Sequence, residues 1–535
     1  MPVSSSADSS RDRTALKVLI AGALAVALVA APYKAFELDR YFIPKELVLH
    51  LCAASAALLC LSTRRRATLS LVDLLLVLFL GASVASAVFA PNLWLAERAV
   101  AISLSGATLF WVAGTLKRAG LGRPLLVALA VAIVVGVSTS LAQAYGVRTE
   151  YFSLNRSPGG TFGNRNFVAH LAAIGLPVVL LVALTARRGT GALVGAVGVA
   201  VLAAALVLSR SRAGWLAVLT LFAPVGLLGI VSYDRWREPK TVRRLVLLAV
   251  AATAGVIAAV MLPNRLDWNS DSPYLDSAAG LVNYKEGSGH GRLVQYTNSL
   301  HMTRAHVALG VGPGNWPVVY PKFASRHDPS LSQDDDMTSN PWPSSDWVAY
   351  LSERGVVGFG LLLAVLLGLL RRAVRDLDQT SRDPERALTA IALVGTLTAT
   401  AVVGAFDAVL LVAIPAFFVW TLLGVMAPSP GTGLTISTGF RSVGTVLAAG
   451  IGVIAVLRST MQLSSMAVFS SSTRTTVIAR SAKLDPASYR LRVKLAEVYL
   501  SRGDCTHARP HARAARDLFP NAPEPKRIIA SCGGR

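Results

Sequence analysis

Long apolar runs, separated by short polar connections, restrict this chain to very few folds. Thirteen of these runs approach the ~20 residues that a helix needs to cross a bilayer. The runs are continuously apolar and do not alternate, which disfavours a β-barrel. Only 15% of the residues are charged, whereas soluble proteins average about 25%. Lipid offers the backbone no hydrogen bonds, so a spanning segment must satisfy its own backbone groups, as a helix does. The sequence therefore predicts an all-α polytopic membrane protein. We expect roughly 13 transmembrane helices, in a range of 11 to 14.

The predicted spans divide the chain into a short tail, two groups of helices, a large loop between the groups and a C-terminal tail. The parts are a disordered tail (1–13), N-terminal helices (14–262), a large polar loop (263–346), C-terminal helices (347–458) and a helical tail (474–535). The spans themselves are 14–31, 47–62, 69–90, 99–116, 124–144, 166–185, 191–208, 213–231, 244–262, 347–370, 387–403, 406–426 and 441–458.

Basic residues are concentrated in every second connection, as the positive-inside rule expects. This alternation predicts a cytoplasmic N-terminus, and it places the large loop and the C-terminal tail outside. The same clusters account for most of the net charge of +22, and no basic-aromatic surface indicates nucleic-acid binding. The clusters are Arg64 to Arg66, Lys117 with Arg118 and Arg123, Arg187 with Arg188, the stretch from Arg235 to Arg244, and the stretch from Arg371 to Arg386.

The C-terminal tail is predicted to contain a tetratricopeptide-like (TPR-like) helical repeat. Pro486 and Pro520 are separated by the 34-residue period of that repeat. A generic helical hairpin is the alternative, because Arg492 occupies the usual tryptophan position. Cys505 and Cys532 both lie in this tail, and an oxidising compartment permits a disulfide between them. The tail is also the candidate surface for a protein partner.

Few arginines lie in the connections predicted to face outward, and those few are candidate anion ligands. Arg210 and Arg212 lie between two apolar runs with almost no loop, and Arg165 follows a glycine-rich stretch. An arginine so close to hydrocarbon is costly unless it reaches lipid headgroups or meets an anion. Both interpretations stay open for Arg210 and Arg212, and membrane lipid is an expected partner.

The large loop contains a glycine-rich turn. Gly310, Gly312 and Gly314, followed by Asn315, predict a tight turn that shapes the loop. A dinucleotide-binding loop is not predicted, because no strand–turn–helix pattern surrounds these glycines. The acidic run 334–336 is interpreted as solvated loop. The sequence therefore predicts neither a metal nor a cofactor.

Five motifs in this order resemble the O-antigen ligase/polymerase family of bacterial envelope proteins. The resemblance covers roughly residues 15–460, and the motifs lie on the predicted outer side. They are GTFGNRNF (160–167), SRAGW (211–215), GR (291–292), HVALGVGPGN (306–315) and DWVAYLSERGVVG (346–358).

The resemblance implies a glycosyltransferase-type ligase or polymerase in the bacterial inner membrane. Such proteins transfer a glycan from an undecaprenyl-diphosphate carrier to an acceptor at the periplasmic face. The acceptor is lipid A–core, another glycan or a protein. The resemblance also implies that arginines rather than a metal bind the diphosphate, since guanidinium forks make bidentate contacts with phosphate. The candidates are Arg212, Arg292, Arg165 and Arg210.

The chain departs from the family at the end of the loop. The family pattern has a histidine nine positions before Glu353, and this chain has Ser344 there. Serine cannot take a proton unaided. Asp346 and Glu353 join Ser344 as catalytic candidates, if burial favours their protonated forms, and His301 and His327 are further loop candidates. The alternative is a non-catalytic scaffold for polysaccharide assembly. A transporter is disfavoured, because the apolar runs contain almost no ionisable residues.

Overall fold

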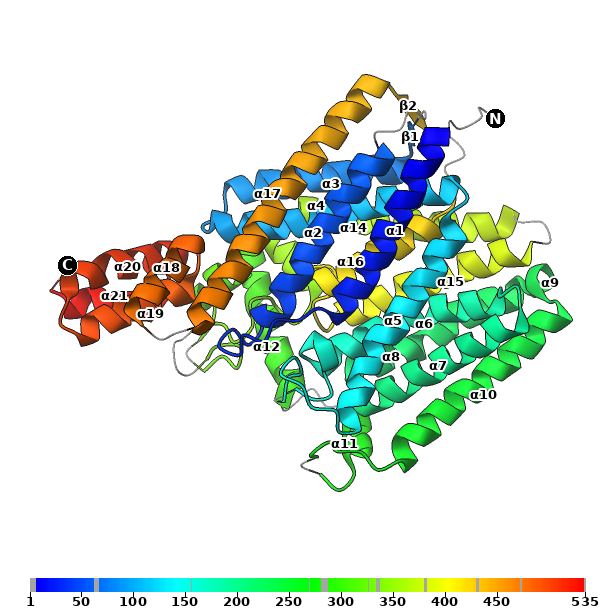
Figure 1. Cartoon of the computed structure of the whole chain (residues 1–535), viewed down its shortest axis with the longest axis horizontal. Coiled ribbons are helices and arrows are strands. Elements are labelled where there is room, and N and C mark those ends of the chain that lie inside the picture. Colours follow the sequence, from blue (N-terminus) through cyan, green and yellow to red (C-terminus); the bar gives the residue numbers. More distant parts are fainter. Residues whose placement is uncertain are drawn as a thin grey trace.

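Figure 1 shows the computed structural model of the chain. It describes residues 6–61, 67–154, 156–268, 270–280, 287–325, 327–332, 337–379, 383–429, 433–471 and 474–533. The acidic run 334–336 and Arg64 to Arg66 lie outside this description. Eleven helices in the described residues are long and apolar enough to cross a membrane. Helices α1 and α16 occupy the two remaining predicted runs, so the structure confirms an all-α multi-pass fold.

The helical body is assembled in chain order from two groups of apolar helices with the loop segments between them. The first group comprises α1 (Ser6–Leu28), α2 (Asp39–Leu61), α3 (Leu71–Val88), α4 (Leu93–Arg118), α5 (Gly122–Ala144), α6 (Arg165–Leu184), α7 (Gly189–Ser209), α8 (Arg212–Val231), α9 (Tyr233–Trp236) and α10 (Pro239–Met261), with η1 (Gly160–Phe162) before α6. The loop carries α11 (Pro273–Ala279), α12 (Gly287–Ala305), α13 (Trp316–Val319) and η2 (Tyr320–Lys322). The second group comprises α14 (Asp346–Gln379), α15 (Pro384–Gly404), α16 (Ala413–Met426) and α17 (Thr438–Ser471).

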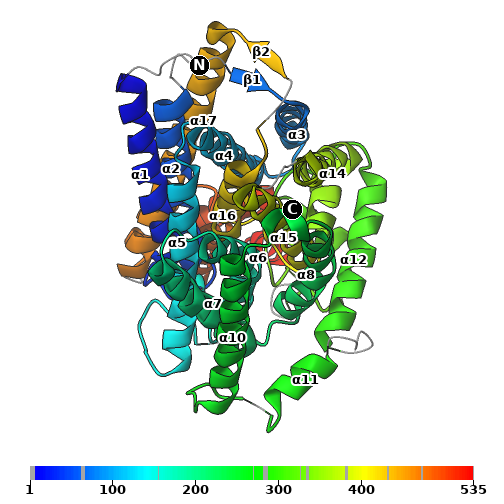
Figure 2. The ribbon, with the colours of Figure 1, turned by 90° about the vertical axis from the view of Figure 1, so that its right-hand side faces the viewer.

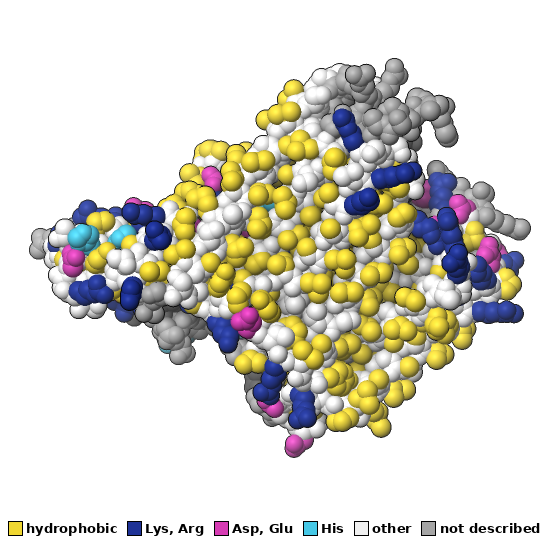
Figure 3. Space-filling model, in the orientation of Figure 1, with side chains coloured by type: hydrophobic (Ala, Val, Ile, Leu, Met, Phe, Trp, Pro, Cys, Tyr) yellow, Lys and Arg dark blue, Asp and Glu magenta, His cyan; other side chains and the backbone are white. Residues whose placement is uncertain are grey.

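Helix α6 is the most deeply buried of the candidate spans in the described part of the chain. It packs against α5, α7, α8 and α15, as Figure 2 shows in the middle of the body. The outer helices α8 and α10 keep large apolar side chains exposed, including Phe222, Ile230 and Val250. Figure 3 shows the resulting broad apolar face, with most charged side chains at its edges and on the tail. Such a surface suits contact with lipid.

Three helix boundaries differ from the sequence prediction for identifiable reasons. Helix α1 begins at Ser6, inside the stretch expected to be disordered, and Asp12 within it is 1% exposed. Helix α16 has 14 residues instead of the predicted span 406–426, because backbone N–H groups before it bind a side chain of α14. Helix α17 continues to Ser471, well beyond the predicted end at residue 458.

A two-stranded antiparallel sheet joins two connections that no sequence pattern predicted to pair. Strand β1 (Ala67–Leu69) pairs with β2 (Leu434–Ile436), with Thr68 opposite Thr435. Three-residue strands carry too little periodic signal to be recognised from sequence. The pair fastens the connection before α3 to the one before α17.

The loop has its own small core, which fixes its position on the body. Trp316 and Tyr320 are fully buried, with ring centroids 4.3 Å apart, and they pack with Met302 and Val311. The Tyr320 hydroxyl donates to Asp328 at 2.7 Å. Burial and this hydrogen bond raise the pKa of Tyr320. We call the side of the body that carries residues 263–345 the loop side.

The C-terminal tail forms a helical unit that projects from the body (Figure 1). Its helices are α18 (Thr475–Leu484), α19 (Tyr489–Ser501), α20 (Cys505–Leu518) and α21 (Pro523–Ser531). The structure shows an antiparallel α19–α20 hairpin with Gly503 at its turn, and the TPR assignment stays a prediction. The tail contacts the loop side, since Asn92 donates to the Leu518 carbonyl and Asn521 to the Val318 carbonyl.

A disulfide joins Cys505 to Cys532, as the sequence allowed. Their Cα atoms are 5.4 Å apart and the closed loop spans 27 positions, so the bond ties α20 to the end of α21. Loop-closure entropy for a loop of this length predicts that Cys532→Ser destabilises the tail by about 3–4 kcal/mol. Thermal unfolding with a tail-specific fluorescent label checks this value. An unchanged midpoint, or alkylation of both Cys505 and Cys532 in the wild type without prior reduction, would contradict it.

Candidate active site at the loop side

Three helix ends bring the candidate arginines together. Helix α6 begins at Arg165, with Asn164 as its N-cap accepting from the Asn166 N–H at 3.0 Å. Helix α7 ends and α8 begins across one sharp turn, in which Arg210 has a φ of 52°. Left-handed backbone is unusual for a residue with a side chain, and such positions are often functional. The turn is closed by Ser211, which caps α8 by accepting from Gly214.

Arg210 and Arg212 hold the first part of the loop against the helical body. The Arg210 Nε donates to the Ser277 hydroxyl at 2.8 Å, and its guanidinium lies over the Trp268 ring, 4.6 Å from the centroid. Arg212 Nη1 donates to the Gly280 carbonyl at 2.5 Å. The contacts of Arg210 are to neutral groups, so they leave its positive charge in place.

Arg165 and Arg292 lie close to the same place. The charges of Arg210 and Arg212 act on Arg165, and the charge of Arg292 acts on His170, one and a half turns further along α6. Both arginines are half-buried, and neither side chain has a hydrogen bond or an ion pair with another described residue. The four predicted arginines therefore lie close enough to the N-terminal end of α6 for their charges to act on residues there.

Some arginines elsewhere in the described chain are neutralised by carboxylates. Arg98 makes a bidentate contact with Glu46, at 2.7 and 2.8 Å, and Arg123 pairs with Glu385 at 2.9 Å. Within the described ranges, no such pair involves Arg165, Arg210 or Arg292. Clustered guanidinium groups repel one another, and an anion is the natural way to offset that repulsion.

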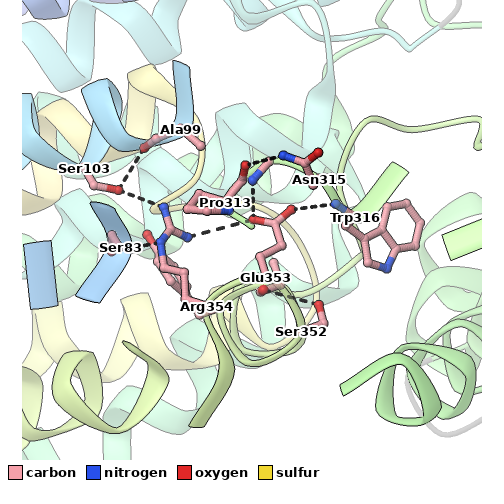
Figure 4. Close-up of polar contacts among 12 residues, drawn as sticks. Ser83, Ala99, Ser103, Pro313, Asn315, Trp316, Ser352, Glu353 and Arg354 are labelled. Atoms are coloured by element: carbon pink, nitrogen blue, oxygen red, sulfur yellow. Dashed lines mark hydrogen bonds and ion pairs between the residues drawn. The ribbon is translucent and has the colours of Figure 1, made fainter. Parts of the chain in front are cut away.

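The glycine-rich turn of the loop is held by Glu353, as Figure 4 shows. The Glu353 carboxylate accepts from the Gly314 N–H at 2.8 Å and from the Trp316 N–H at 3.2 Å. Asn315 exchanges hydrogen bonds with the backbone of Asn92, at 2.8 and 3.0 Å. Glu353 is 2% exposed and both its oxygens are occupied, so it acts here as the anchor of the turn. Its catalytic assignment stays an untested prediction.

Two glycines let the turn and helix α14 touch through their backbones. Gly310 has a φ of 69°, and a Cβ on it would lie 2.3 Å from the Glu353 carbonyl carbon. Gly355 has a φ of 64°, and its Cβ would lie 2.2 Å from the Ala308 carbonyl oxygen. Gly312 and Gly314 are likewise at positive φ, 98° and 69°. A side chain at any of these positions meets both strain and a clash.

Arg354 is a buried cation that the sequence analysis did not single out. It is 1% exposed, donates to the hydroxyls of Ser83 and Ser103 at 3.2 and 3.0 Å, and lies 3.9 Å from the Glu353 carboxylate (Figure 4). It thereby ties α14 to α3 and α4. The only sequence signal was the adjacent pair of opposite charges, Glu353 and Arg354, inside the apolar run 347–370, because charges in such a run require partners.

The other two predicted catalytic residues lie beside the connection between α15 and α16. Asp346 is fully buried and accepts from the N–H groups of Val409 and Leu410 at 3.0 and 2.8 Å. Ser344 contributes backbone groups, its N–H donating to Gln295 and its carbonyl accepting from Tyr296. Asp346 therefore serves to hold the non-helical segment 405–412. The catalytic assignments of Ser344 and Asp346 also remain predictions.

Removing the Asp346 carboxylate is expected to loosen this segment. Asp346→Ala leaves two buried N–H groups without an acceptor, at a cost of about 1–3 kcal/mol each. Amide hydrogen exchange at Val409 and Leu410 is the measurement, with Asp346→Asn as the milder variant because its amide oxygen still accepts. Unchanged protection in Asp346→Ala would show that the carboxylate does not hold the segment.

A buried histidine and a nearby aspartate complete the site, and neither was among the predicted site residues. His170 is fully buried, and neither ring nitrogen has a hydrogen-bond partner among the described groups. Its Nε2 lies 3.9 Å from Asp407 Oδ2, and the Asp407 side chain is 16% exposed. An unsatisfied buried polar group costs about 1–3 kcal/mol, so a histidine in this state calls for an explanation.

The fold and site describe a multi-pass helical membrane protein with an arginine-rich centre at the loop side. Comparison with known families sharpens this class: residues 197–363 match a family model described as O-Antigen ligase. The matched stretch contains Arg210, Arg212, Arg292, the glycine turn and Glu353, and it supports a place for this chain in that family. No curated protein matches the chain.

Proposed function

We propose that this protein transfers a glycan from a polyprenyl-diphosphate-linked donor to an acceptor at the periplasmic face of the bacterial inner membrane. The reaction is that of an O-antigen ligase or a related polymerase in envelope polysaccharide biosynthesis. One observation carries the proposal. Arginines from three separate connections lie close enough to the N-terminal end of α6 for their charges to act there, and no carboxylate pairs with Arg165, Arg210 or Arg292 in the described part of the chain.

The chemistry of the donor fits this arrangement. When the bond between sugar and diphosphate breaks, negative charge develops on the leaving diphosphate. Preorganised cations beside that charge lower the barrier by several kcal/mol. Arg212, Arg165 and Arg292 bind the phosphate oxygens, and Arg210 positions the turn between α7 and α8. The apolar surface of the helices accommodates the polyprenyl chain in the bilayer.

A protein partner is proposed for the tail, and lipid A–core, a glycan or a protein as acceptor. The tail is fastened to the loop side by Asn92 and Asn521, so whatever binds it is held near the site. The proposals of a protein partner and of an acceptor follow from the position of the tail beside the loop side. They say where the partner or acceptor would lie without identifying it.

A deletion strain tests the proposed transfer. Loss of lipopolysaccharide ladders, exopolysaccharide or glycoprotein glycans, restored by the wild-type chain, is the expected result. A strain that retains all three would contradict the proposal. The direct assay is undecaprenyl diphosphate release from lipid-linked glycan in membrane vesicles of the native strain.

A non-catalytic scaffold is the second candidate, and one observation favours it. Ser344 stands where the family has a histidine, while Asp346 and Glu353 are fully engaged in holding backbone N–H groups. A scaffold predicts that truncating the tail abolishes glycan output while Arg165→Ala and Arg212→Ala leave it unchanged. A transferase predicts instead that Arg165→Ala and Arg212→Ala lower glycan output.

A further inference from the structure

His170 and Asp407 lie next to the place where the family's loop histidine is absent. Tyr296 donates its hydroxyl to the carbonyls of both Ser344 and Ala405, at 2.7 and 2.9 Å. Ser345 donates to the Gly404 carbonyl at 3.1 Å. The end of the loop and the start of the α15–α16 connection therefore run side by side, and Asp407 follows Ala405 by two residues.

The two side chains differ in what they can reach. The Asp407 carboxylate is partly exposed and accepts one backbone hydrogen bond, from Ala408 at 2.8 Å. His170 is buried directly behind it, with the Phe167 ring edge-on at 5.9 Å. The 3.9 Å separation of Nε2 and Oδ2 is longer than a hydrogen bond, so a small movement is needed to join them. Catalytic hydrogen bonds are often long before substrate binds.

We propose that His170 and Asp407 together accept the proton of the acceptor hydroxyl, an inference that rests on the proposed function. Asp407 contacts the hydroxyl, and the proton passes through its carboxylate to His170 Nε2. The hydroxyl oxygen uses the freed electron pair to bond to the anomeric carbon. The bond from that carbon to the diphosphate oxygen breaks, and its electron pair leaves on the diphosphate. The imidazolium that forms is paired with the Asp407 carboxylate.

The charges around the pair connect it to the donor site. Asp407 and Arg292 are the charged groups whose fields act on His170, and Asp346 lies close enough to Asp407 for their charges to interact. A diphosphate bound to Arg292 offsets that positive charge when His170 takes the proton. Donor binding and proton transfer are thereby linked through one arginine. His170 and Asp407 both lie outside residues 197–363, the stretch matched by the family model. Their pairing is therefore identified from the structure and not from the family match.

The test separates binding from transfer in the full-length protein. Undecaprenyl diphosphate binding is measured in nanodiscs, and its release from lipid-linked glycan is measured in vesicles of the native strain. Asp407→Asn is expected to lower release by about 10²–10⁴-fold with binding unchanged, the range of general-base catalysis. His170→Asn is expected to lower release similarly and to change how release depends on pH, since the group that takes up the proton is removed. Added formate is expected to restore release in part to Asp407→Ala, which a purely structural role would not show.

The matched control is the second Asp–His pair of the described chain, in the tail. Asp504 and His507 form a contact at 2.7 Å, and Asp504→Asn and His507→Asn are expected to leave release unchanged. If Asp407→Asn and His170→Asn both release undecaprenyl diphosphate within threefold of the wild-type rate, the proposed role of this pair in proton transfer is wrong, and the proposed function is unaffected. A wild type that neither binds nor releases undecaprenyl diphosphate overturns the proposed function itself. If His170→Asn misfolds and no longer binds undecaprenyl diphosphate, the release measured for Asp407→Asn decides whether the proposed pair stands, because Asp407 is partly exposed.

Discussion

Replacing Arg212 by alanine is expected to lower glycan transfer by about 10²–10³-fold, the usual effect of removing one preorganised donor to a developing charge. Arg212 begins α8 and donates to the Gly280 carbonyl, so a diphosphate has to replace that neutral acceptor. Arg212→Lys keeps the charge without the planar fork, and we expect it to lose transfer by about tenfold. Release of undecaprenyl diphosphate in membrane vesicles provides the measurement.

The control for Arg212 is an arginine of the same side without a role in the site. Arg265 is exposed and lies at the beginning of the loop, so Arg265→Ala is expected to transfer at the wild-type rate. Equal rates for Arg212→Lys and wild type would favour simple charge over bidentate recognition. Equal rates for Arg212→Ala and wild type would remove Arg212 from the site.

Replacing Gly355 by alanine is expected to destabilise the protein strongly. The new methyl group would lie 2.2 Å from the Ala308 carbonyl oxygen, at a φ of 64°. Overpacking costs about 1–3 kcal/mol, and a residue with a Cβ in this backbone conformation (φ 64°, ψ −174°) costs a further ~1–3 kcal/mol. The contact between the glycine turn and α14 should open, which releases the loop from the body. The thermal unfolding midpoint in detergent and the rate of proteolysis within the loop are the measurements.

Gly360 provides the matched control, because it lies five residues further along the same helix. A Cβ there meets nothing within 4 Å. Gly360→Ala is therefore expected to be neutral or to stabilise the helix by up to about 1 kcal/mol. If Gly355→Ala were as stable as Gly360→Ala, the backbone contact between Gly355 and Ala308 would not hold the loop.

The apolar runs predicted the helical body because bilayer physics acts on local sequence. Each run from 14–31 to 441–458 became a helix, since a span satisfies its own backbone hydrogen bonds. The exception is instructive. The run 406–426 is as apolar as the others, but its first residues leave the helix because Asp346, from another helix, accepts the N–H groups of Val409 and Leu410. Such a contact between distant segments has no local signature.

The site was predictable in part for the same reason. Arg210 and Arg212 stand out because charge at the edge of an apolar run is costly wherever it occurs. His170 does not stand out, because it lies within an apolar run and its partner Asp407 is far away in sequence. Glu353 was recognised as important, but its contacts with Gly314 and Trp316 depend on how the loop folds. Residue type showed where chemistry is possible, and only the fold showed which side chains meet.

The most direct test of the arginine site is a cryo-electron microscopy map of the full-length protein in nanodiscs with undecaprenyl diphosphate. We predict density for the two phosphates at the N-terminal end of α6, within hydrogen-bond distance of the Arg165, Arg212 and Arg292 guanidinium groups. We also predict that the polyprenyl chain leaves this point along the apolar surface of the helices. Diphosphate density at the opposite side of the helical body, or density on the loop side that contacts none of these arginines, would contradict the account.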